Sequence, residues 1–134
     1  MPIERLPYSG ESPQDRFAYQ RYLYELRERG KSLLQLTTVA SEITPWIRQS
    51  WSPRTFTGVV TSAGEFDALV CNISYHFNKR AIEGGGFASI TSMTLEAQQH
   101  FRANRQHAEL QPNGTLKLPK GTFEMDGRII TFHR

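Results

Sequence analysis

The chain has 134 residues, 38% of them hydrophobic and 11% aromatic, which suits one soluble globular domain built around one core. No apolar run approaches the ~18 residues that a membrane span needs, and the first residues lack the apolar centre of a signal peptide, so we expect neither. Sixteen Lys and Arg against thirteen Asp and Glu give a net charge of +3, a balance that favours a nucleic-acid partner without requiring one. Cys71 is the only cysteine, which excludes an internal disulfide, and its apolar neighbours indicate a small buried residue.

Residues 1–54 are expected to be a helical N-terminal layer. A first helix is predicted to begin at Ser12-Pro13, where an N-cap residue precedes a proline at the first helical position, and to end at Gly30. This layer could serve the delivery of the rest of the protein, or it could complete the core. Its amphipathic pattern favours packing on the rest of the chain, so we expect a single domain over residues 1–134.

A second helix is predicted from Ser32, and Pro45 lies inside its pattern. Because proline interrupts a helix, we expect a kink or a new helix at Thr44-Pro45. Trp46 and Trp51 are expected to be core anchors rather than platforms for a ligand. The buried stripe of this segment is predicted to be Leu36, Val39, Ala40, Ile43 and Ile47.

The middle of the chain predicts a short strand and then a helix. Residues 55–61 are rich in β-branched side chains. Ser62 and Glu65 have the spacing of a capping box, which predicts a helix over residues 62–80 that stops before the glycines at 84–86. Its buried stripe is predicted to be Phe66, Leu69, Val70, Ile73 and Phe77. Three side chains that can carry positive charge fall near its end: His76, Lys79 and Arg80.

The last part of the chain predicts one more helix and a small sheet. The helix is expected over residues 93–105, capped by Thr91 or Ser92, with Met93, Ala97, His100 and Phe101 on one side. Hairpin turn signals follow at 112–114 and 126–127, between short β-rich runs. Helices first and a meander last predict the α+β class, with N-terminal helices packed on a small C-terminal antiparallel sheet.

The C-terminal half resembles the tRNase domains of bacterial competition toxins, in the barnase/EndoU/colicin/RelE-like group. The similarity lies in HFNKR at 76–80, the glycine-rich loop before Phe87, NGTLKL at 113–118 and DGRIITF at 126–132. Colicin D-type toxins and contact-dependent inhibition toxins are the nearest in pattern. The resemblance implies that residues 55–134 form a nuclease-like core of that fold.

This chain departs from the family pattern at two positions. Arg80 stands where the family usually has a second His, and an arginine does not deprotonate near neutral pH. His133 stands where the family commonly has an aromatic residue. We therefore expect His76 or His133 to supply the titrating imidazole.

RNA cleavage without a metal uses the substrate's own 2′-hydroxyl as nucleophile, and it needs a base, an acid and cations at the phosphate. Histidine suits proton transfer because its pKa lies near 6.5, and Lys and Arg suit the phosphate. We predict a catalytic site of His76, Lys79, Arg80, Thr131 and His133, in which the threonine bonds a phosphate oxygen. RNA is predicted to be bound by Lys79, Arg80, Lys117 and Arg128, with no metal and no cofactor.

The same side chains have structural interpretations. A single helical histidine such as His76 is usually structural, and cations at a helix end compensate the helix dipole. His133 lies close to the end of the chain, where fraying is common. His100 and His107 lack partners at metal-ligand spacing, so we interpret them as surface or packing residues.

The sequence therefore favours a ribonuclease toxin that cleaves tRNA or another structured RNA. It would be secreted or delivered into the cytoplasm of a target bacterium and neutralised by a cognate immunity protein. One alternative is a non-catalytic nucleic-acid-binding module, which predicts salt-sensitive binding of RNA that stays intact. Another is a protein-binding immunity or adaptor protein, which the positive net charge disfavours because inhibitors of basic nucleases tend to be acidic.

Overall fold

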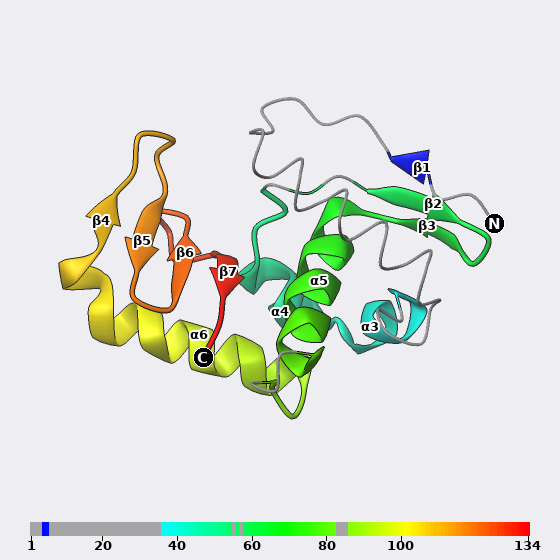
Figure 1. The fold of residues 1–134 in the computed structure, drawn as a ribbon, viewed down its shortest axis with the longest axis horizontal. Coiled ribbons are helices and arrows are strands. Elements are labelled where there is room, and N and C mark those ends of the chain that lie inside the picture. The colour runs from blue at the N-terminus through cyan, green and yellow to red at the C-terminus, as the bar shows by residue number, and fades with distance from the viewer. Residues whose placement is uncertain (1–3, 6–35, 55, 57, 83–85) are drawn as a thin grey trace.

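The computed structural model describes residues 4–5, 36–54, 56, 58–82 and 86–134 (Figure 1). The first predicted helix, which ends at Gly30, lies outside the described residues. Within them the helices are α3 (Leu36–Glu42), α4 (Pro45–Ser50), α5 (Ala68–Ile82) and α6 (Ile90–Asn104), followed by a 3₁₀ turn at Arg105–His107. Two antiparallel sheets accompany these helices, so the predicted α+β class is confirmed.

Helix α4 is a new helix and not a continuation of α3, which confirms one of the two outcomes expected at Pro45. The Thr44 hydroxyl accepts the backbone N–H of Ile47 over 3.2 Å, with the proline in the first turn. Trp51 is 1% exposed and belongs to the core, as predicted, but Trp46 is 40% exposed. The prediction for Trp46 is wrong because α4 turns Ile47 inward and leaves the preceding side chain outside.

A hairpin occupies the place where the long helix was predicted to begin. Sheet A joins β1 (Glu4–Arg5), β2 (Val59–Thr61) and β3 (Gly64–Phe66). Ser62 lies in the turn between β2 and β3, so its predicted role as helix cap is wrong. Helix α5 begins only at Ala68, because Asp67 Oδ1 accepts the backbone N–H of Val70 over 3.0 Å.

Helix α5 crosses the middle of the molecule, with sheet A on one side and sheet B with α6 on the other (Figure 1). It contacts α3, α6 and β7. All eight residues from 69 to 76 are buried, so α5 is enclosed on every side there, whereas the sequence predicted one apolar stripe.

Sheet B contains β4 (Glu109–Leu110), β5 (Leu116–Leu118), β6 (Gly121–Phe123) and β7 (Ile129–Phe132), in chain order. Both predicted hairpin turns are confirmed, and Gly114 and Gly127 adopt the positive φ that such turns require. A β-bulge inserts Ile130 into β7, because Thr122 pairs with Thr131 and Phe123 pairs with Ile129.

Helix α6 begins three residues before its predicted start. Ser89 and Ser92 form a reciprocal capping box, each hydroxyl accepting the other residue's backbone N–H over 3.0 Å. The helix packs against β7 and buries Met93, Ala97 and Phe101, as predicted.

The segment at residues 51–52 joins the helices to sheet B. The backbone N–H of Ser52 donates to the carbonyl of Ile129 over 2.8 Å. From α5, the fully buried Asn72 donates to the carbonyls of Ser52 and Ile130, at 2.8 and 3.1 Å. These bonds supply partners for backbone groups at the edge of β7 that lack a neighbouring strand.

Candidate functional site

His76 lies in the core and not at a cleft. It is 5% exposed, and its ring lies 5.1 Å from the Tyr75 ring, 6.2 Å from Phe56 and 6.3 Å from Trp51, between centroids. Three aromatic rings this close to the imidazole leave no room beside it for a substrate phosphate. In this structure His76 therefore occupies the position of a buried structural histidine and not that of a catalytic residue.

The other predicted residues of the mid-chain helix are not placed. Lys79 and Arg80 belong to α5, but their side chains lie outside the part that the structure describes.

Thr131 and His133 are both partly exposed, while Ile130 and Phe132 are each 2% exposed, which confirms the predicted division of this strand. The Thr131 hydroxyl accepts the backbone N–H of Thr122 over 3.0 Å. This bond gives that N–H a partner where the bulge interrupts the hydrogen bonds between β6 and β7. The Thr131 side chain therefore stabilises sheet B.

His133 lies beside residues that the sequence did not associate with it. Its backbone N–H donates to the carbonyl of Lys120 over 2.9 Å, and its Nδ1 lies 3.1 Å from the carbonyl oxygen of Arg134. His76 is 5% exposed in the core, whereas His133 is partly exposed after β7, so only His133 is accessible to a substrate phosphate in this structure.

The second imidazole near His133 is that of His100, on α6. Its Nε2 accepts the backbone N–H of Lys120 over 3.1 Å, and its Nδ1 lies 3.1 Å from Nδ2 of Asn104. Burial lowers the pKa of His100 below 6.5, and the positive charges of Lys120 and His133 lower it further. His100 is therefore a neutral imidazole near pH 7.

A cavity of about 470 Å³ opens between α6 and the end of β7, which we call the α6–β7 pocket. Its polar lining comes chiefly from Glu96, His100, Asn104, Lys120 and Arg134. Arg134 donates to both carboxylate oxygens of Glu96, at 2.9 and 3.2 Å, and its guanidinium lies 4.8 Å from the centre of the Phe87 ring. The pocket therefore combines cations, one carboxylate and a neutral imidazole.

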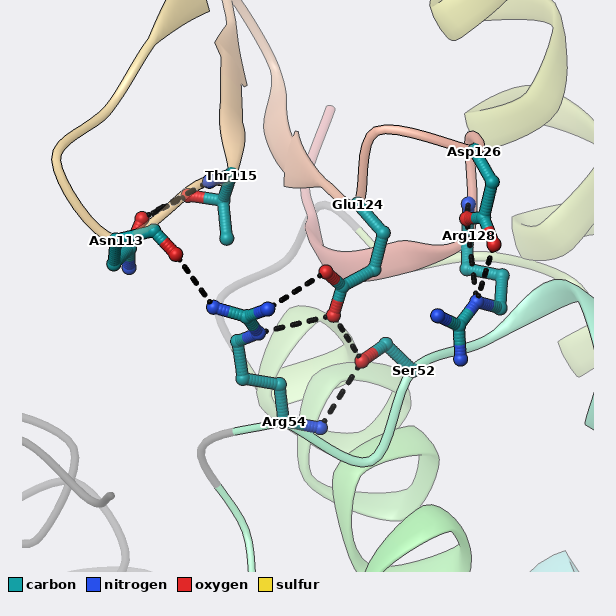
Figure 2. Close-up of polar contacts among 7 residues, drawn as sticks. All are labelled: Ser52, Arg54, Asn113, Thr115, Glu124, Asp126 and Arg128. Atoms are coloured by element: carbon teal, nitrogen blue, oxygen red, sulfur yellow. Dashed lines mark hydrogen bonds and ion pairs between the residues drawn. The ribbon is translucent and has the colours of Figure 1, made fainter.

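The predicted RNA-binding residues Lys117 and Arg128 lie apart along sheet B. Lys117 is exposed on β5. Arg128, after the β6–β7 turn, bonds both oxygens of Asp126 through Nε, at 2.9 and 3.2 Å (Figure 2). It lines a second cavity of about 530 Å³.

A buried carboxylate, which the sequence did not single out, connects the two halves of the described chain (Figure 2). Glu124 receives two bonds from the Arg54 guanidinium, at 2.9 and 3.0 Å, and one from the Ser52 hydroxyl, at 2.6 Å. Arg54 also donates to the carbonyl of Asn113 over 3.0 Å. Because its oxygens are all engaged, Glu124 is a structural anion and not a free base.

Sequence reasoning missed His100, Lys120 and Arg134 as companions of His133. The available signal was that His100 shares a side of its helix with core residues and therefore faces the sheet. The sequence did not indicate that His100 lies near Lys120, His133 and Arg134, because these residues are distant from it in sequence. Only the packing of α6 on β7 brings them together.

Comparison with protein-family models, with curated proteins and with solved structures gave no match for this chain. The resemblance to the tRNase toxins therefore stays a prediction. In the part of the chain that the structure describes, no three His, Cys, Asp or Glu side chains gather as they would around a metal ion. Among the described helices, none has both the length and the apolar character needed to cross a bilayer.

Proposed function

We propose that this protein is an endoribonuclease that cuts tRNA or another structured RNA at the α6–β7 pocket. The observation that carries the proposal is the meeting of two imidazoles at Lys120, whose backbone N–H donates to Nε2 of His100 and whose carbonyl accepts the backbone N–H of His133. Burial lowers the pKa of His100, and the charges of Lys120 and His133 lower it further. His100, Lys120 and Arg134 line the α6–β7 pocket, and His133 lies in the chain between the lining residues Phe132 and Arg134. Metal-independent RNA cleavage needs a base for the 2′-hydroxyl proton and cations beside the phosphate, and an imidazole beside lysine and arginine side chains can supply both.

In the proposed reaction the 2′-hydroxyl of the substrate attacks its own phosphorus, and the imidazole of His133 takes the hydroxyl proton. The bond from phosphorus to O2′ forms as the bond to O5′ breaks, and the Lys120 ammonium protonates the leaving 5′-oxygen. The products are a 2′,3′-cyclic phosphate and a free 5′-hydroxyl. Lys120 and Arg134 offset the negative charge that grows on the phosphate.

His100 is a positioning residue in this proposal. Its Nε2 holds the backbone of Lys120, and its lowered pKa keeps it neutral. His76 has no part in the reaction because its ring is enclosed by aromatic side chains.

The test is incubation of total tRNA with the purified protein in EDTA, with products resolved on a gel. Wild type should yield defined fragments ending in a cyclic phosphate. H133A should be at least about a hundredfold slower, as expected for loss of a general base. H107A is the matched control, because His107 is exposed in the 3₁₀ turn after α6. Unchanged cleavage by H133A would overturn the proposed site.

The toxin role, with delivery into a target bacterium and a cognate immunity protein, belongs to the same proposal and is supported by the sequence resemblance. Expression of the chain inside bacteria should then arrest growth, and H133A should relieve the arrest. Continued growth with full-level expression of the wild-type protein would contradict the toxin role.

A second candidate is a basic module that binds RNA without cutting it. It is favoured by the bonds that already occupy the pocket: Arg134 is held by Glu96, and both ring nitrogens of His100 lie within 3.1 Å of nitrogen atoms. This candidate predicts intact tRNA in the same assay together with binding that weakens steeply with salt.

A further inference from the structure

The second cavity, of about 530 Å³, lies away from the α6–β7 pocket, and the two share no lining residue. Four separate segments meet around it: α4, the segment after Trp51, the start of α5 and the end of the β6–β7 turn. We call it the Arg48–Arg128 pocket. Its apolar lining includes Trp51, Pro53 and Leu69.

Two guanidinium groups line this pocket, and each has one nitrogen committed to a carboxylate. Arg48 donates from Nη1 to Asp67 over 2.8 Å, and Arg128 donates from Nε to Asp126. Within the described residues, the other guanidinium nitrogens of these two arginines form no hydrogen bond. Figure 2 shows the terminal nitrogens of Arg128 pointing away from Asp126.

The two carboxylates are held by the backbone as well as by the arginines. Asp67 caps α5 through the N–H of Val70, and Asp126 accepts the backbone N–H of Arg128 over 3.0 Å. That backbone bond is the main reason why the pKa of Asp126 is lowered. Since both aspartates have local partners, the exposed arginine side chains can turn towards a new anion.

The start of α5 adds to the attraction for an anion. Asp67, Ala68 and Leu69 line the pocket, so the positive end of a 15-residue helix faces it. Guanidinium groups bind phosphate through two parallel N–H bonds, and an apolar floor accepts a flat ring.

We propose that the Arg48–Arg128 pocket binds a nucleotide unit, with its phosphate between Arg48 and Arg128 and its base against exposed Pro53, above the buried side chains of Trp51 and Leu69. The phosphate could belong to a free mononucleotide or to an RNA strand. Binding at this pocket does not depend on the proposed ribonuclease activity, because none of its residues takes part in that reaction.

The test uses Trp51 as the reporter. The chain has two tryptophans, so W46F leaves the one that lines the pocket. Adding AMP should change its fluorescence in a saturable way, and adenosine should have a much weaker effect. In the same background, R48A and R128A should each weaken AMP binding about tenfold or more, as expected for a lost bond to a charged group. D126N should strengthen it, because it removes the competing carboxylate.

The matched control is R102A, since Arg102 is exposed on α6 and bonds only a carbonyl of its own helix. A loss in R102A equal to that in R128A would overturn the inference, as would equal responses to AMP and adenosine. A response to a short RNA but not to AMP would support the pocket and assign the phosphate to a strand. No response to either ligand at millimolar concentration would contradict the proposal. That result would not bear on tRNA cleavage at His133, which the cleavage assay tests separately.

Discussion

The backbone N–H of Lys120 donates to Nε2 of His100 over 3.1 Å, and this bond ties the turn between β5 and β6 to helix α6. A protonated Nε2 cannot accept that bond. The position of Lys120 therefore depends on a neutral imidazole, which burial of His100 favours.

Stability should fall with acid through His100. Its folded pKa is lowered, so its contribution is fully present above the unfolded value of 6.5 and is lost as the pH falls from there towards the folded pKa. H100Q should unfold with a weaker dependence on pH below 6.5 than wild type. Urea denaturation of both proteins at several pH values measures the difference, and identical pH profiles would contradict the assignment.

Removal of the Lys120 ammonium should slow tRNA cleavage. K120A keeps the backbone bond to His100 and loses only the side-chain cation, so we expect a loss of about a hundredfold, the usual effect of removing one donor to a developing oxyanion. K117A, on the neighbouring strand, removes the same charge outside the pocket and should change cleavage less than about tenfold. Equal losses would indicate that only the net charge matters.

Loss of the buried carboxylate should destabilise the fold. E124A leaves Arg54 and the Ser52 hydroxyl without their acceptor, at a cost of about 2 kcal/mol, because Arg54 is about a third exposed and water replaces part of the interaction. The double variant R54A/E124A should cost less than the sum of the two single variants. Denaturant titration of all three measures the coupling, and strict additivity would contradict it.

Gly121 should tolerate no side chain. A Cβ there would collide with the carbonyl oxygen of Thr131 on the paired strand, which is backbone and cannot move aside cheaply. We expect G121A to cost more than about 2 kcal/mol. G114A is the comparison: its turn has open space and a φ of +84°, so only the backbone strain of about 1 kcal/mol applies. Thermal unfolding ranks the two.

The cap of α6 distinguishes the structure from the sequence-based prediction. S89A should cost about 1 kcal/mol because it removes the hydroxyl that accepts the N–H of Ser92. T91A, at the position that the sequence suggested as a cap, should cost much less, since Thr91 is exposed within the helix. A larger effect at Thr91 would place the start of the helix where the sequence predicted it.

Local patterns predicted much of the fold correctly. The break at Pro45, the turns at 112–114 and 126–127 and the buried side of α6 follow from short-range chemistry, and the structure has all of them. The error at Ser62 has a local cause as well. A capping-box spacing and a β-hairpin turn use the same residue types, and pairing of β2 with β3 favoured the hairpin.

The candidate site was predictable only in part. The sequence by itself determined that His133 and Thr131 lie on the open side of the last strand, while Phe132 between them is buried. Side chains alternate between the two faces of a strand because of the backbone geometry. Tertiary packing decided the companions of His133: residues 69–76 of α5 are enclosed on all sides, which places His76 in the core, while α6 lies along β7 and brings His100 and Lys120 to the same end. Contacts between segments distant in sequence depend on how whole elements pack, and no local pattern encodes that packing.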